Sequence, residues 1–72
     1  MKNLLEVPVG SRARLVSVDV LRKKLLQYGL HMGDSLQILR VAPLGGPVLV
    51  EVNGREVALG RTVAEKILVE VE

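Results

Sequence analysis

The sequence predicts a small all-β protein, and three observations support this class. Hydrophobic residues make up 49% of the 72-residue chain, and none of them is Phe or Trp. Several short segments alternate apolar and polar residues, as strands with one buried face do. The dipeptide Asn53-Gly54 stands between two such segments and is typical of a tight β-hairpin turn. A chain of this length forms one domain at most, so we expect residues 1–72 to share one core.

The composition excludes several functional classes. The chain has no cysteine, which rules out a disulfide scaffold, a cysteine-based zinc site and a thiol nucleophile. No apolar run reaches the roughly 18 residues that a membrane-spanning helix needs. The segment Met1–Glu6 has two leucines and then a charge, so it does not resemble a signal peptide. We therefore expect a cytoplasmic protein.

The first half of the chain predicts a strand followed by a helix. Residues 11–18 alternate, with Ala13 and Leu15 on one face. Asp19 can cap a short helix over about residues 20–28, which Gly29 ends because it tolerates positive φ. The apolar residues of this helix recur at helical spacing and are Leu21, Leu25 and Tyr28.

The second half predicts four further elements. A turn over residues 30–34 leads into a strand over 35–41, and the loop Pro43-Leu44-Gly45-Gly46-Pro47 separates it from a strand over 48–52. A two-residue turn at Asn53-Gly54 fixes the register of the hairpin. Its expected pairs are Val52 with Arg55, Glu51 with Glu56, Val50 with Val57, and Val48 with Leu59.

The end of the chain predicts one helical turn and a closing strand. Thr62-Val63-Ala64-Glu65 fits a capping box, which places a helical turn near residues 63–66. A last strand covers residues 67–71. Five short strands cannot leave a flat sheet with two long exposed edges, and closure into a barrel removes these edges. We therefore expect a five-stranded SH3-like barrel, with the last strand sealing it against the first.

Several motifs, in a fixed order, resemble those of the FeoA family. Leu25, Gly29, Leu30 and Gly33 match the pattern Leu-x-x-x-Gly-Leu-x-x-Gly. Residues 42–47 are similar to the family's Ala-Pro-Leu-Gly-x-Pro loop, and Met32 stands where the family commonly has proline. Further matching positions are Val9-Gly10, Asn53-Gly54, Ala58-Leu59, and Ala64 with Ile67.

The resemblance implies a role in ferrous iron transport and transition metal ion homeostasis. A FeoA-like protein is an accessory that binds FeoB, a membrane iron transporter with a cytosolic GTP-binding domain, so some of it would be found at the membrane. The resemblance implies no cofactor and no small-molecule substrate. The same SH3-like module also resembles the C-terminal domain of iron-dependent repressors, but no helix-turn-helix precedes it in this sequence.

The residues give no pattern for catalysis or a metal site. There is no Ser-His-Asp set, no Walker lysine and no Gly-x-Gly-x-x-Gly motif, so we expect no enzyme. His31 is the only histidine, stands on a turn, and has no obvious partner. Glu51 faces Glu56 in the expected register, and a cation would relieve their repulsion. We favour two solvated carboxylates and expect no bound iron.

Two binding surfaces remain as candidates. Leu44 stands near the tip of the loop Pro43-Leu44-Gly45-Gly46-Pro47 and either contacts a protein partner or folds back over the barrel. The basic run Arg22-Lys23-Lys24 would steer an acidic surface toward this loop from the adjacent helix. Arg12 and Arg14 would join that run in nucleic-acid binding, but Tyr28 is the only aromatic residue and is expected to face the core.

Three functions stay open: a transporter adaptor, a nucleic-acid-binding barrel and a stand-alone regulatory domain. Exposed sheet edges would also allow a homodimer.

Overall fold

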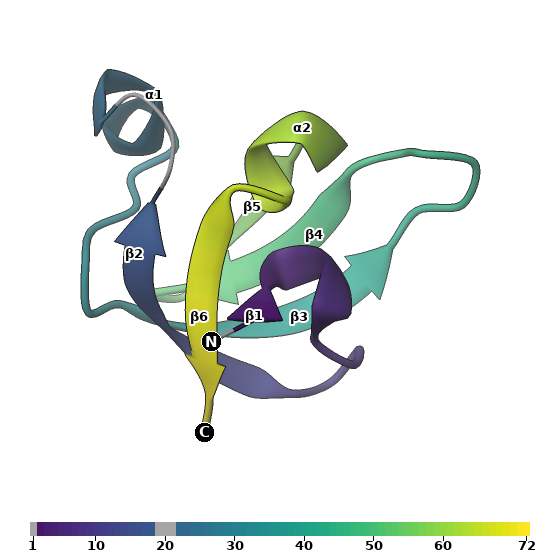
Figure 1. The fold of residues 1–72 in the computed structure, drawn as a ribbon, viewed down its shortest axis with the longest axis horizontal. Helices are drawn as coiled ribbons and strands as arrows, with labels where there is room; N and C mark the ends of the chain where they lie inside the picture. Colours follow the sequence, from purple (N-terminus) through teal and green to yellow (C-terminus); the bar gives the residue numbers. More distant parts are fainter. Residues whose placement is uncertain (1, 19–21) are drawn as a thin grey trace.

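The protein folds into one antiparallel sheet that curls around its core, shown in Figure 1. The computed structural model describes residues 2–18 and 22–72. The predicted Asp19 cap and the core position of Leu21 lie outside these residues. The elements in chain order are β1 (Lys2–Asn3), the 3₁₀ helix η1 (Leu4–Glu6), β2 (Arg12–Val18), α1 (Arg22–Gln27), β3 (Ser35–Val41), β4 (Val48–Val52), β5 (Arg55–Leu59), α2 (Arg61–Ala64) and β6 (Ile67–Val71).

The sheet confirms the predicted all-β class and the predicted pairing of the last strand, β6, with the strand predicted first, β2. Its order is β1-β6-β2-β3-β4-β5, and each neighbouring pair is antiparallel. Strand β6 lies between β1 and β2, with Lys2 opposite Val69 and Leu15 also opposite Val69. The prediction of five strands omitted β1, which has two residues and therefore shows no alternation in the sequence.

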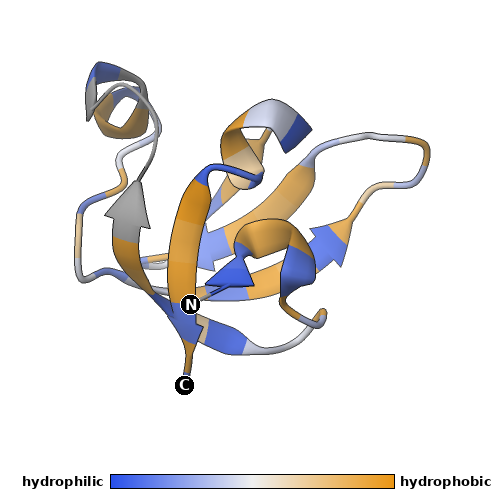
Figure 2. Cartoon of the chain, viewed as in Figure 1, coloured by the Kyte–Doolittle hydropathy of each residue, from blue (hydrophilic) through white to orange (hydrophobic). Residues whose placement is uncertain are grey.

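The alternation of the sequence becomes the alternation of burial. In β4, Val48, Val50 and Val52 are buried, whereas Leu49 and Glu51 are half-buried. Figure 2 shows apolar stretches on the strands that line the interior. The largest side chains that are completely buried are Leu4, Leu15, Leu30, Leu36, Ile38, Leu59 and Ile67. Burial of this aliphatic set supplies the main stabilising free energy, because stabilisation follows the apolar area removed from water.

The β4–β5 hairpin has the predicted register in every pair. Val52 lies opposite Arg55, Glu51 opposite Glu56, Val50 opposite Val57 and Val48 opposite Leu59. Asn53 has φ 52° and Gly54 has φ 77°, as the two central residues of a type I′ turn require.

Gly29 follows the end of α1 by two residues, and two features favour glycine there. Gly29 has φ 74°, a left-handed conformation that glycine adopts without a steric penalty. A Cβ at this position would also collide with the guanidinium of Arg55. That guanidinium donates from Nη2 to the carbonyl oxygens of Gly29 at 3.0 Å and Tyr28 at 3.4 Å. Arg55 thus binds the carbonyl end of α1 from the neighbouring hairpin.

Two details at the helical turns differ from the sequence prediction. The helical turn α2 covers Arg61–Ala64 rather than residues near 63–66, and its N-cap is Gly60, without a side-chain cap hydrogen bond. The predicted capping box at Thr62–Glu65 is therefore wrong. Burial of Val63 and Ala64 determines where the turn lies, because packing outweighs a local cap.

A capping box does occur at a place the sequence analysis missed. The Oδ1 atom of Asn3 accepts from the Leu5 amide at 2.9 Å, and the Asn3 amide donates to Glu6 Oε1 at 2.9 Å. These bonds begin η1, which buries Leu4 completely. Among the residues of this structure, no helix is long and apolar enough to cross a membrane.

Candidate partner-binding surface

The loop between β3 and β4 is a hairpin end with a defined backbone. The last strand pair is Val41 with Val48. The Ala42 amide then donates to the Pro47 carbonyl at 3.0 Å, and the Gly46 amide donates to the Pro43 carbonyl at 3.1 Å. These bonds close a four-residue turn from Pro43 to Gly46.

Both central residues of this turn have positive φ. Leu44 has φ 58° and Gly45 has φ 77°, which is the pattern of a type I′ turn. A left-handed conformation costs a residue with a Cβ about 1–2 kcal/mol. Gly46 is required for a different reason, because a Cβ there would lie 2.6 Å from the Cβ of Ala42. The loop therefore holds a leucine in an unfavourable conformation at its tip.

The side chain of Leu44 is fully exposed, with a relative accessibility of 104%. Of the two positions predicted for this side chain, the one folded back over the barrel is therefore wrong. Figure 1 shows the loop extending away from the sheet beyond the ends of β3 and β4. Backbone strain and apolar exposure coincide at one residue, and such a combination is typical of a contact site.

The structure does not bring the basic helix next to this loop. Helix α1, which carries Arg22, Lys23 and Lys24, lies at the opposite end of the molecule from the β3–β4 loop (Figure 1). Of these three side chains the structure describes that of Lys23, which is exposed. The eight predicted contact residues therefore form two separate groups rather than one patch.

His31 has a partner that the sequence analysis did not identify. Its Nδ1 atom lies 3.7 Å from Asp34 Oδ2, and the same carboxylate oxygen accepts from the His31 amide at 2.9 Å. The imidazole is exposed, as expected for a turn residue. Asp34 follows His31 by three residues, and this spacing within a turn was the available signal.

The predicted cross-strand pairing of two glutamates on the β4–β5 hairpin is confirmed. Glu51 and Glu56 face each other across β4 and β5. Neither forms an ion pair with any residue that the structure describes. In the same part of the chain, no group of three or more His, Asp or Glu residues is placed to hold a metal ion.

The aromatic residue and the basic strand residues are also separate. Tyr28 is partly buried and packs against the core, as predicted. Arg12 and Arg14 are exposed on β2.

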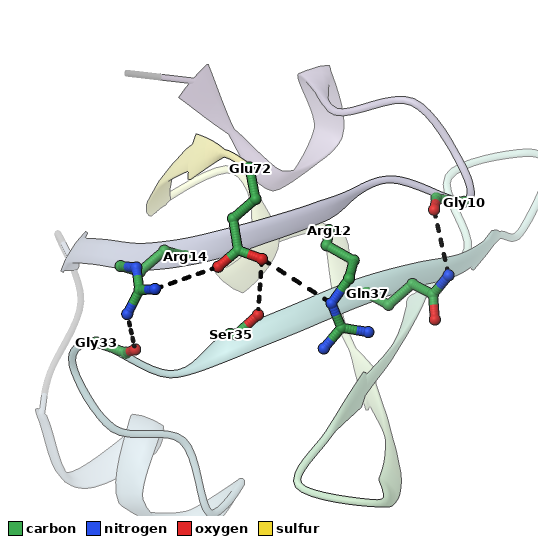
Figure 3. Close-up of polar contacts among 7 residues, drawn as sticks. All are labelled: Gly10, Arg12, Arg14, Gly33, Ser35, Gln37 and Glu72. Atoms are coloured by element: carbon green, nitrogen blue, oxygen red, sulfur yellow. Dashed lines mark hydrogen bonds and ion pairs between the residues drawn. The ribbon is translucent and has the colours of Figure 1, made fainter.

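A polar network on β2, β3 and β6 was not predicted. Figure 3 shows the carboxylate of Glu72 between Arg12, Arg14 and Ser35. The distances to Glu72 are 3.0 Å from Ser35 Oγ, 3.5 Å from Arg14 Nη2 and 3.9 Å from Arg12 Nε. The available signal was the alternation Arg12-x-Arg14 and Glu70-x-Glu72 on two strands that a closed barrel pairs.

The fold is that of a small SH3-like barrel. Among the described residues, the most exposed large apolar side chain is that of Leu44, on the loop between β3 and β4. A family model of the FeoA domain matches residues 2–71. The chain therefore belongs to the FeoA domain family, as its motifs predicted.

Two relatives illustrate this membership. The chain is 35% identical over 71 residues to a Fe(2+) transport protein A/Fe(2+) transporter FeoB fusion protein of Porphyromonas gingivalis. It is 35% identical over 48 residues to a putative Fe(2+) transport protein A of Methanocaldococcus jannaschii. The matches cover 94% and 67% of this chain, but 8% and 56% of these relatives.

Solved structures agree in fold. The iron uptake regulatory protein FeoA superposes with a TM-score of 0.86 at 30% identity, covering 99% of this chain and 96% of that one. The FeoA protein from Chlorobium tepidum gives 0.85 at 39% identity, covering 96% and 69%. The manganese regulator SloR gives 0.86 at 26% identity, and the match covers 99% of this chain but 34% of SloR. The same barrel thus also occurs as one part of a longer regulator.

Proposed function

We propose that this protein is a non-enzymatic accessory of ferrous iron uptake that binds a FeoB-type GTP-binding membrane transporter and modulates it. The observation that carries this proposal is the fusion relative, in which a FeoA part and a FeoB transporter are one polypeptide. Fusion gives two modules a high effective concentration for each other, which is useful when they interact. In this chain the contact would be made in the cytoplasm, and the protein would reach the membrane through its partner.

We assign the contact to the loop Pro43-Leu44-Gly45-Gly46-Pro47. Leu44 supports this assignment because it is the most exposed large hydrophobic side chain of the described residues. The backbone of this turn is already formed, so it loses little conformational freedom on binding, and burying the leucine side chain in a partner's pocket would contribute favourably.

The basic residues of α1 have a separate role in this proposal. Helix α1, which carries Arg22, Lys23 and Lys24, lies at the opposite end of the molecule from the loop (Figure 1), so their proposed role is in the approach of the partner. Charges outside a contact change the association rate and its salt dependence more than the affinity.

The test uses the whole chain and the purified cytosolic part of a FeoB-type transporter. Surface plasmon resonance compares the wild type with Leu44→Asp and with Val9→Asp, a matched change at another exposed apolar turn residue, which is 59% accessible. We expect Leu44→Asp to abolish binding while its far-UV circular dichroism stays unchanged, and Val9→Asp to bind like the wild type.

Two results would contradict parts of the proposal. If the wild type does not bind the transporter, the adaptor function is wrong. If the wild type and Leu44→Asp bind equally, the function stands but the loop is not the contact. Replacing Arg22, Lys23 and Lys24 with glutamine tests whether these residues attract the partner from a distance or contact it. We expect a slower association rate and an unchanged dissociation rate, as for long-range attraction.

A further inference from the structure

The outer face of β2, β3 and β6 holds one carboxylate among three donors. The Glu72 carboxylate accepts from Ser35 Oγ at 3.0 Å and lies 3.5 Å from Arg14 and 3.9 Å from Arg12 (Figure 3). The donors come from two adjacent strands in register, with Arg14 opposite Ser35 and Arg12 opposite Gln37. The three side chains therefore converge on one carboxylate.

Part of this donor set is positioned without Glu72. Arg14 also donates from Nη1 to the Gly33 carbonyl at 3.2 Å. Gln37, which lies opposite Arg12 in the sheet, donates from Nε2 to the Gly10 carbonyl at 3.2 Å (Figure 3). Ser35 and Arg14 belong to paired strands, so their backbone positions do not depend on the Glu72 side chain. Arg14 would therefore keep its contact with Gly33 if the Glu72 side chain moved away.

The amide of Glu72 donates to the Arg12 carbonyl at 2.9 Å, but the side-chain carboxylate is held less firmly. Glu72 follows the last residue of β6, and its side chain keeps 32% of its accessibility. Both arginine distances exceed the roughly 2.7–2.9 Å of a strong charge-assisted hydrogen bond. Exposed ion pairs of this kind exchange easily with water and with other anions.

We propose that Arg12, Arg14 and Ser35 form a second interaction surface, which binds acidic side chains of a protein partner and which Glu72 occupies when no partner is bound. Glu72 then acts as an internal competitor that lowers the affinity of the free surface. This surface is separate from the Leu44 loop and does not depend on the proposed function.

The spacing of the arginines indicates the form of the partner segment. Residues two apart on a strand point to the same side and are about 6.6–6.8 Å apart. An extended acid-x-acid segment has the same spacing. The chain provides its own example, because Glu70-Val71-Glu72 runs antiparallel to Arg12-Ala13-Arg14, with Ala13 opposite Val71.

The surroundings favour carboxylates over a nucleic-acid backbone. Glu70 lies opposite Arg14, and Glu51 lies opposite Gln37, so acidic residues stand on both sides of the arginines. A polyanion that runs across the strands would meet the negative charge of both Glu70 and Glu51. Single-stranded nucleic acids also need aromatic stacking, and the only aromatic residue, Tyr28, packs against the core.

The experiment is a titration of ¹⁵N-labelled protein, followed by NMR. The probe is the capped peptide acetyl-Gly-Glu-Gly-Glu-Gly-amide, and the same peptide with glutamines is the control. Glu72→Gln removes the internal competitor, and Glu65→Gln is its match because Glu65 is exposed and causes the same change in net charge. Arg14→Gln is matched by Arg40→Gln, another exposed arginine.

We expect shifts at Ser35 and at the arginine Nε–H groups with the acidic peptide and none with its control. Glu72→Gln should tighten binding about threefold and Arg14→Gln should weaken it about fivefold, as weak exposed ion pairs allow. Glu65→Gln and Arg40→Gln should change it little.

Equal effects of Glu72→Gln and Glu65→Gln would overturn the proposal, as would equal effects of Arg14→Gln and Arg40→Gln. Tighter binding of an oligothymidine at the same residues would show a phosphate surface and would overturn the partner class. Because Glu72→Gln is a gain of binding, an unfolded Arg14→Gln variant would still leave the proposal testable.

Discussion

Replacing Gly29 with alanine tests how Arg55 links α1 to the hairpin. The change has two costs in this structure. Alanine at φ 74° costs about 1–2 kcal/mol in the folded state. Its Cβ also displaces the Arg55 guanidinium from the carbonyls of Tyr28 and Gly29, which costs about a further 0.5–1.5 kcal/mol. The unfolded chain loses freedom with alanine, which offsets about 0.4–1 kcal/mol.

The expected net destabilisation is therefore about 1.5–2 kcal/mol. Gly45→Ala is the matched control, because Gly45 has φ 77° and a Cβ added there would meet no heavy atom within 4 Å. It should lose only about 0.5–1 kcal/mol, from backbone strain less the gain in the unfolded state. The difference between the two variants isolates the Arg55 contact.

The assay is urea unfolding followed by far-UV circular dichroism, in the wild-type and Arg55→Ala backgrounds. Once Arg55 is absent, Gly29→Ala should cost no more than Gly45→Ala. The reasoning is refuted if the cost of Gly29→Ala stays the same without Arg55, because the collision would then contribute nothing.

Three further changes have defined outcomes. Leu44→Asn should raise the free energy of unfolding by about 0.5–1 kcal/mol, because asparagine tolerates the left-handed conformation better than leucine; a lower urea midpoint would contradict the strain at this turn. Glu56→Lys should stabilise the hairpin by about 0.5 kcal/mol, because an attraction between the introduced lysine and Glu51 would take the place of the repulsion between Glu56 and Glu51. This stabilisation should weaken in 1 M salt, and the control variant Glu65→Lys should not show it. Ile38→Val, at a position with 0% accessibility, should cost about 0.5–1.5 kcal/mol in the same assay, and a neutral result would mean that the core repacks.

The elements that the sequence predicted well are those with local causes. The β4–β5 register follows from Asn53-Gly54, because the turn chemistry and the apolar pairs such as Val50 with Val57 require the same alignment. The turn after α1 needs a residue with positive φ, and Gly29 is the residue type that adopts this conformation most easily. Such features need no knowledge of distant parts of the chain.

The features that the sequence did not predict depend on distant contacts or on packing. Glu72 meets Ser35 only after the sheet has closed, so no local pattern pairs them. Arg55 reaches Gly29 across the fold for the same reason. The position of α2 follows from the burial of Val63 and Ala64 rather than from the polar residues that suggested a cap. The exposure of Leu44 depends on two backbone angles that composition alone does not determine.

The place of β6 in the sheet has a consequence for synthesis of the protein. Strand β6 is made last but fills the gap between β1 and β2, which are made first. Until β6 leaves the ribosome, the facing edges of β1 and β2 carry unpaired amide and carbonyl groups, and such edges associate readily with other chains. Slow translation of residues 67–71 would lengthen this interval and favour aggregation of the nascent chain.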